Sequence, residues 1–262
     1  MRILMVDWSG RKTRPEQAIA LAEVQDGRLL RVEKGRDREQ VLAELLAMIA
    51  DGQKTFIGLD FAFSLPAWFL EQRDWTVDEL WSAETETWLR DCTPPFWGRP
   101  GIRKPAGDDD FHYRQTDQQV SINGIRPKSV FQIGGAGSVG SGSLRGFWIL
   151  PLLRQAGTAI WPFDGAKHVT AAEVYPRAFT GPVVKGAANS RAQHLLACQD
   201  VARSDHVNQQ MIDDEDCFDA GCTAMGLWAQ RQQLTQLRAT TDPRVMLEGE
   251  ILTPKRLGQS LD

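Results

Sequence analysis

Two short apolar runs that each end in an aspartate constrain this chain most. Residues 3–6 lead into Asp7, and residues 56–59 lead into Asp60. Neither run alternates with polar residues, so both are expected to be strands covered on both faces, as in the centre of a parallel sheet. A carboxylate at the carboxyl end of such a strand lies where α/β proteins place their ligand sites. If the strands are neighbours, about 4.8 Å apart, one carboxyl group must be protonated or a cation must bridge the two.

Size and charge limit the classes of protein that the chain can belong to. With 262 residues and 42% hydrophobic content, the chain can bury a sizeable core, and we expect residues 1–262 to form a single domain. The net charge of -4 argues against tight non-specific binding of nucleic acid over the whole surface, because such binding needs many cations. A local basic groove is still allowed.

Cysteine spacing and hydropathy give further expectations. The four cysteines do not follow the C-x-x-C spacing, which favours buried free thiols over a zinc site or a redox pair. No apolar stretch reaches the roughly 20 residues needed to span a bilayer. The first strand follows directly after Met1-Arg2, which leaves no room for a signal peptide. We therefore expect a cytoplasmic protein without a membrane partner.

The order of predicted elements indicates a mixed α/β sheet that begins with an antiparallel meander. Residues 17–24 and 28–33 are predicted to form a hairpin around Asp26-Gly27. Residues 37–50 carry an apolar stripe with helical spacing, and residues 54–60 form the next strand. Later strands are predicted at 129–133, 158–163 and 169–175, and later helices at 143–155, 189–203 and 214–232, with Pro151 near a break in the first of these.

Residues 93–145 are predicted to be a large insertion, irregular over 93–128 and then rich in glycine. Between Phe96 and Arg145 seven basic residues face four aspartates, an imbalance that suits a polyanionic ligand. Arg126, Lys128 and Arg145 are the candidates to bind such a substrate, together with Ser9 in the turn after Asp7. The alternative is a solvated insertion with scattered charges.

The glycine-rich segment 134–142 contains a G-x-G-x-x-G pattern at residues 135–140. It follows a predicted strand and precedes a predicted helix, and Asp164 follows at about the distance of a dinucleotide-binding fingerprint. Against this interpretation, Pro151 lies in the crossover helix and too few strands follow. A phosphate contact through backbone amides and a purely structural turn both stay open.

Two acidic residues near the start of the last long helix are candidates for the same site. Asp216 and Asp219 are three residues apart, which places both carboxylates on one helical face. The apolar stripe that continues from Ala220 predicts that Asp219 points towards the sheet, where an acid is costly unless it is neutralised. The alternative is an acidic N-terminal cap on an exposed helix.

Glu173 lies within the predicted strand 169–175, on the same face as Ala171 and Tyr175. It could be a further metal ligand or a base that orients water. It could equally be an edge charge that faces water, or a partner of Arg177.

Several segments, taken in order, resemble an uncharacterised protein family known as DUF429. The segments are VDWSG, IGLDFAFSLP, KSVFQIGGAGSVGSGSLRG, EVYPRAF, DDEDCFDAGCTAMGLW and EGEI, and they span nearly the whole chain. That family is grouped with the ribonuclease H-like fold and described as a predicted nuclease. The resemblance implies a five-stranded sheet of order 3-2-1-4-5 flanked by helices, with the strands of Asp7 and Asp60 adjacent. The irregular segment 93–128 departs from a minimal ribonuclease H.

Carried over by position, Asp7, Asp60 and Asp219 match the acids of this fold, Asp216 resembles an extra acid, and Glu173 is an accessory. The resemblance and the acids together predict a metal-dependent nuclease. In such an enzyme, Asp7, Asp60 and Asp219 hold two Mg²⁺ or Mn²⁺ ions about 3.5–4 Å apart and the substrate is a nucleic acid. Two alternatives are a nucleotide-binding phosphotransfer protein, which normally needs two such domains, and a non-catalytic binding module with the same fold.

Overall fold

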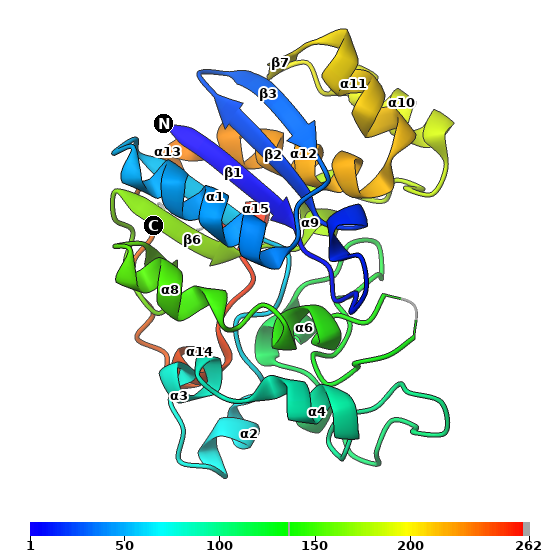
Figure 1. Cartoon of the computed structure of the whole chain (residues 1–262), viewed down its shortest axis with the longest axis vertical. Coiled ribbons are helices and arrows are strands. Elements are labelled where there is room, and N and C mark those ends of the chain that lie inside the picture. Colours follow the sequence, from blue (N-terminus) through cyan, green and yellow to red (C-terminus); the bar gives the residue numbers. More distant parts are fainter. Residues whose placement is uncertain (136, 259–262) are drawn as a thin grey trace.

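The computed structural model describes residues 1–135 and 137–258, and its centre is a mixed sheet of seven strands (Figure 1). The strand order is β5-β6-β4-β1-β2-β3-β7. The strands are β1 (Arg2–Asp7), β2 (Ala20–Gln25), β3 (Arg28–Glu33), β4 (Thr55–Leu59), β5 (Ala159–Trp161), β6 (Val169–Glu173) and β7 (Ala202–Arg203). An α/β fold with a mixed sheet is therefore present, but the sheet has seven strands rather than the five predicted.

Strand direction follows from the connections. β1, β2 and β3 form an antiparallel meander, in which the loop of residues 8–19 joins β1 to β2 and the turn at Asp26-Gly27 joins β2 to β3. β4 returns beside β1 in the parallel direction after a helical crossover, and β6 lies parallel to β4. The two additional strands, β5 and β7, extend the edges in parallel to β6 and β3, with three and two residues respectively. β1 and β4 thus lie at the centre of the sheet, with their carboxyl ends at one rim.

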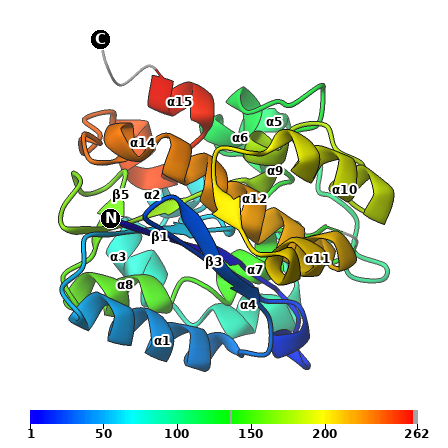
Figure 2. The same ribbon diagram turned by 90° about the horizontal axis from the view of Figure 1, so that it is seen from above.

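Helices cover both faces of the sheet (Figure 2). α1 (Arg38–Ala50) and α8 (Ile149–Gln155) lie on the face that receives Leu4 and Val6, whereas α12 (Glu215–Ala229) and α11 (Asp205–Asp213) lie on the face that receives Ile3 and Met5. The alternation of side chains along β1 thus supplies two separate cores. α1 begins at Asp37, whose carboxylate accepts a hydrogen bond from the Gln40 amide.

The remaining helices are mostly short, and several of them gather below the sheet in the view of Figure 1. They are η1 (Pro15–Gln17), α2 (Ala67–Glu71), α3 (Val77–Trp81), α4 (Thr85–Asp91), α5 (Asp109–His112), α6 (Gln115–Gln119), α7 (Gly140–Leu144), α9 (Pro176–Thr180), α10 (Ala188–Ala197), α13 (Arg231–Leu234), α14 (Pro243–Glu248) and α15 (Pro254–Gly258). Within the described ranges, no helix is long and apolar enough to cross a lipid bilayer.

Three predicted elements differ from the structure. Residues 129–133 do not form a strand, because Ser129 starts a turn and only an isolated bridge joins Gln132 to Trp97. The helix predicted over 143–155 is two helices, α7 and α8, and Pro151 is accommodated in the first turn of α8, where no amide donor is needed. The helix predicted over 189–203 ends at Ala197, and the chain then adds the edge strand β7 to β3.

Candidate functional site

Asp7 and Asp60 lie side by side at the carboxyl ends of β1 and β4. Val6 pairs with Leu59 in the parallel register, and the amide of Asp60 donates a hydrogen bond to the Val6 carbonyl at 3.0 Å. Because each aspartate follows one of these paired residues, both side chains leave the sheet on the same face. A side-chain hydrogen bond links the two carboxyl groups, which requires a proton on one of them.

Asp219 reaches the same face of the sheet from α12. This helix packs on β1 and β2 through the core that contains Ile3 and Met5. Asp219 is only 6% exposed, and Asp7 is 8% exposed. The charge of Asp219 acts on both Asp7 and Asp60, so the three side chains form one acidic cluster. Asp7, Asp60 and Asp219 are called the acidic cluster below.

The acidic cluster holds its carboxyl groups in an unfavourable environment for charge. Burial, and next the charges of Asp60 and Asp219, raise the pKa of Asp7 well above its ordinary value. Burial also raises the pKa of Asp60 to about 7, although its hydrogen bond with Asp7 acts in the opposite direction. The pKa of Asp219 is raised by burial and held back by Lys185. Two carboxyl groups that share one proton explain these directions.

Lys185 is the cation of this site, and the sequence analysis missed it. Its ammonium forms an ion pair with Oδ2 of Asp219, whereas Oδ1 of Asp219 is buried with no hydrogen-bond partner in the described residues. The charge of Lys185 also acts to lower the pKa of Asp60, but burial outweighs this contribution. Burial lowers the pKa of Lys185, but the charge and hydrogen bond of Asp219 outweigh it and raise that pKa. The sequence gives little sign of this role, since Lys185 is a single charged residue within the segment 181–186, GPVVKG.

Asp216 lies at the edge of the acidic cluster. It sits in the first turn of α12, and its carboxylate accepts a hydrogen bond from Lys34 at 2.6 Å. Lys34 also binds Asp214, the residue that caps the helix, at 2.7 Å. The charge of Asp216 contributes to the raised pKa of Asp7. Asp216 is therefore close to the cluster and already paired with a cation.

Glu173 lies on the opposite face of the sheet. It pairs in register with Leu59, not with Asp60, so its side chain points towards the core that contains Leu59. There Arg114 binds both carboxylate oxygens of Glu173, at 2.7 and 2.6 Å. The expected partner Arg177 instead donates hydrogen bonds to the carbonyls of Gly181 and Val183. The Glu173 side chain thus points away from the face that carries the acidic cluster, although its charge still contributes to the raised pKa of Asp60.

The four predicted substrate-binding residues fall into two groups. Arg145 donates to the carbonyl of Gly10 at 2.5 Å, so it and Ser9 lie beside the loop that follows Asp7. Arg126 lies 3.8 Å from Asp109 within the insertion. Lys128, which is exposed, passes close to Gly137 in the same part of the chain. Arg145 and Ser9 are therefore placed at the loop after Asp7, where Arg38 of α1 also binds the Ser9 carbonyl, whereas Arg126 and Lys128 belong to the insertion.

The glycine-rich segment packs against the loops that follow β1 and β4. The indole of Trp8 donates to the Gly142 carbonyl at 3.1 Å, and the amide of Ala62 donates to Oγ of Ser143 at 3.0 Å. A Cβ atom on Gly10 would lie 2.2 Å from Oγ of Ser141, so only glycine fits there. Ala136 lies outside the described residues. Because no strand precedes this segment, the expected context of a dinucleotide-binding fingerprint is missing.

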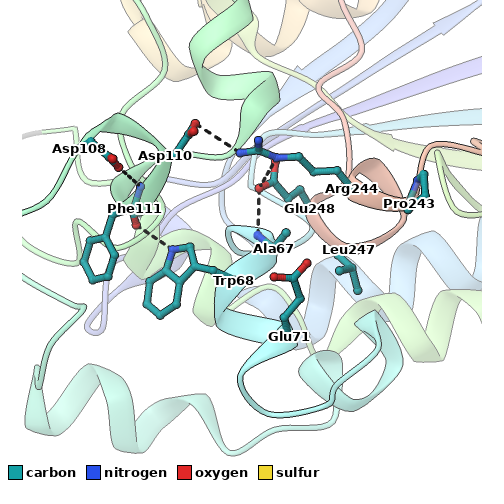
Figure 3. Close-up of a pocket in the computed structure, with 10 residues that line it drawn as sticks. All are labelled: Ala67, Trp68, Glu71, Asp108, Asp110, Phe111, Pro243, Arg244, Leu247 and Glu248. Carbon is teal, nitrogen blue, oxygen red and sulfur yellow. Dashed lines mark hydrogen bonds and ion pairs between the residues drawn. The ribbon is translucent and has the colours of Figure 1, made fainter.

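A cavity of about 560 Å³ lies away from these residues, between α2, α5 and α14 (Figure 3). Arg244 joins Asp110 to Glu248 across it, at 3.5 and 3.1 Å. Glu248 also accepts a hydrogen bond from the amide of Ala67 at 2.9 Å. Asp110 and Glu248 thus bind other protein groups, and none of the predicted site residues lines this cavity.

The side chains of the acidic cluster are not arranged to coordinate a metal ion. Across residues 1–135 and 137–258, no group of three or more His, Cys, Asp or Glu side chains could hold a metal ion as arranged. The donors nevertheless suit Mg²⁺ or Mn²⁺ in kind, since they are carboxylate oxygens and one of them has no partner. Comparisons of the chain with protein-family models, curated proteins and solved structures found no match. Function is therefore inferred from the residues of the site alone.

Proposed function

We propose that this protein is a metal-dependent nuclease that hydrolyses phosphodiester bonds, with the acidic cluster as the metal-binding centre. The observation that carries the proposal is the convergence of Asp7, Asp60 and Asp219 at one rim of the sheet. Three acids with a single lysine among them hold more potential negative charge than that lysine can neutralise. A divalent cation would remove this imbalance.

We also propose the ribonuclease H-like fold, in agreement with the resemblance to the DUF429 family. The inner strands support this assignment, because their order is β3-β2-β1-β4-β6 with an antiparallel first hairpin. In this view β5 and β7 are short additions at the two edges. The four free cysteines suit a reducing compartment, so we propose a cytoplasmic location as well.

In this proposal, Asp7, Asp60 and Asp219 would hold Mg²⁺ or Mn²⁺. When bound, such ions would supply an activated water and would stabilise the leaving oxygen of the phosphodiester. Lys185 binds Oδ2 of Asp219 and orients that carboxylate. Ser9 and Arg145 would contact the substrate at the loop after Asp7, whereas Arg126 and Lys128 would contact a more distant part of a nucleic acid.

Cleavage of defined substrates with Mg²⁺ or Mn²⁺ tests the proposal. Single-stranded RNA, single-stranded DNA, an RNA–DNA hybrid and a branched DNA should be compared, and Asp7→Asn should abolish cleavage of any substrate that the wild type cleaves. The matched control is Asp213→Asn, the same chemical change at an exposed position. Since a neutral side chain is already favoured at Asp7, the variant should fold. Full activity in Asp7→Asn would falsify the assignment.

A second candidate is a binding module without turnover, and the ion pair of Lys185 with Asp219 favours it. In that case the lysine is a permanent replacement for a metal ion. Calorimetric titration with Mn²⁺ separates the two candidates, because a folded protein that binds no divalent ion would be a binding module. The phosphotransfer alternative gains no support, since the described residues form one sheet rather than two domains.

A further inference from the structure

A second cavity, of about 500 Å³, opens at the same end of the sheet as the acidic cluster, but on the face that α1 covers rather than on the face that α12 covers. β3 runs in the same direction as β1, so α1, which follows β3, begins at this rim. Residues from α1, from the loop after β1 and from α4, α7 and the turn after α7 form the walls. They include Lys12, Arg38, Glu39, Glu86, Arg145 and Trp148. This space is called the basic cavity below.

Two guanidinium groups are fixed in the basic cavity by the loop that follows Asp7. Nη2 of Arg38 donates to the carbonyls of Ser9 and Arg11, both at 2.6 Å, and Arg145 donates to the carbonyl of Gly10 between them. Three residues of extended chain span at most about 11 Å, so Gly10 is at most that far from Asp7. The two cations therefore lie within reach of a polymer bound at the acids.

The positive charge of the basic cavity is only partly neutralised. Burial, and next the charge of Arg145, lower the pKa of Arg38 to about 10. Nε of Arg38 is buried and has no hydrogen-bond partner in the part of the chain that the structure describes. Lys12 is exposed at the mouth. Guanidinium groups present several donors in one plane, which matches the oxygens of a phosphate group.

The acids of the basic cavity differ in how far they are engaged. Asp37 caps α1 through the Gln40 amide. Glu86 binds Arg145 at 3.1 Å. Glu39 is exposed in the first turn of α1, and its negative charge would repel an anion in the cavity. The cavity therefore contains one acid whose removal should improve anion binding.

We propose that the basic cavity binds a phosphate group of a nucleic-acid strand through Lys12, Arg38 and Arg145. The proposal rests on the nuclease function and deepens it, since it leads the substrate backbone from the acidic cluster past the loop after Asp7 to the face of the sheet that α1 covers. Trp148, whose indole donates to the carbonyl of Arg145, offers a ring face to the neighbouring sugar or base. The sequence signal is the run RKTR at residues 11–14, directly after the turn that follows Asp7.

Binding of a short, labelled single-stranded DNA in EDTA tests this proposal without any cleavage. Lys12→Gln and Arg38→Gln should each weaken binding roughly fivefold to tenfold at 0.1 M salt, and each should reduce the slope of log affinity against log salt by about one. Glu39→Gln should strengthen binding. Arg231→Gln is the matched control, because Arg231 lies with Met1 at the opposite end of the sheet.

Lys12→Gln guards against misfolding, since Lys12 is exposed whereas Arg38 also holds the loop. If both variants bind DNA as tightly as Arg231→Gln does, or if the wild type binds no DNA, the proposed phosphate site is wrong. Failure of the nuclease function gives a different result, namely DNA binding that depends on Lys12 and Arg38 without cleavage in Mg²⁺ or Mn²⁺. Inorganic phosphate as competitor shows whether the site recognises the phosphate alone.

Discussion

Lys185 forms an ion pair with Asp219 across the gap between the loop after α9 and helix α12, so the acidic cluster contains its own cation. Both residues are largely buried, since only 16% of the side-chain surface of Lys185 and 8% of that of Asp219 is exposed. A buried carboxylate that loses such a partner must become protonated or attract another cation. Loss of Lys185 should therefore destabilise this protein, and a divalent ion bound at Asp219 should compensate for that loss.

Lys185→Met should destabilise the protein by about 3 kcal/mol in EDTA, because the substitution leaves Asp219 buried and unpaired. For a chain of this size that corresponds to a fall in melting temperature of roughly 6–12 °C. Mn²⁺ should then stabilise Lys185→Met more than it stabilises the wild type. Thermal unfolding with and without Mn²⁺ measures both effects, with the exposed Lys54→Met as control. Equal stabilisation of both proteins by Mn²⁺ would contradict this role of Lys185.

Asp60 should make the metal-free protein less stable as the pH rises. Its pKa is raised from 3.8 to about 7 in the folded protein. Between these values the folded state binds more protons than the unfolded state, so stability is highest below pH 4 for this group and is lost as the pH approaches 7. The loss is at most about 1.4 kcal/mol per pH unit for one proton.

Asp60→Asn should remove this dependence. Urea unfolding in EDTA across the range from about pH 4.5 to 8 should show a flatter profile for the variant, and the variant should be the more stable protein above pH 7. The difference between the two proteins reports the proton that Asp60 shares with Asp7, since the titrating groups outside this pair are common to both. A difference in unfolding free energy that stays constant with pH would show that Asp60 does not titrate in this range.

Glu173→Gln should affect the fold rather than metal binding. Arg114 would lose a buried partner, and breaking such a pair costs about 3 kcal/mol. Urea unfolding measures this cost, with the exposed Glu84→Gln as a comparison. Calorimetry with Mn²⁺ should give the same affinity for Glu173→Gln as for the wild type. A large loss of Mn²⁺ affinity in a folded variant would show that Glu173 contributes to metal binding.

Gly10→Ala should disturb the contact between the loop after Asp7 and the glycine-rich segment. The added methyl group would collide with Oγ of Ser141 and with the amide of Gly142, at 2.2 and 2.6 Å. We expect a loss of about 2 kcal/mol in the free energy of unfolding, as is usual for overpacking. Gly258→Ala, where the methyl group meets open space, should change stability by less than about 0.5 kcal/mol. Equal effects of the two changes would mean that the loop moves freely.

The features that could be predicted from sequence are those that local patterns encode. The unbroken apolar runs before Asp7 and Asp60 mark central strands, and the helical stripe of residues 37–50 marks α1. The stripe after Ala220 likewise indicates that Asp219 turns inward, and that side chain is buried. Each of these patterns is contained within a single element, so its period is readable without knowledge of the fold.

The features that were missed depend on contacts between distant segments. Lys185 lies 34 residues from Asp219, and Arg114 lies 59 residues from Glu173, so no spacing rule connects either pair. The strand β7 has only two residues and exists because β3 offers it an edge. Residues 129–133 have strand-like composition, yet Phe131 is used to fill an aromatic core with Phe69 and Phe96.

Arg114 gives the insertion a consequence for any attempt to trim the protein. This side chain, from the middle of residues 93–128, also binds Asp117 at 2.7 Å and the carbonyl of Glu248 at 3.2 Å. A shortened protein that lacks this segment would leave the buried carboxylate of Glu173 without its ion pair to Arg114. The backbone at Glu248 would also lose its hydrogen bond from Arg114. The segment is therefore required for the stability of the whole fold, and it cannot be removed or transferred to another protein as an independent module.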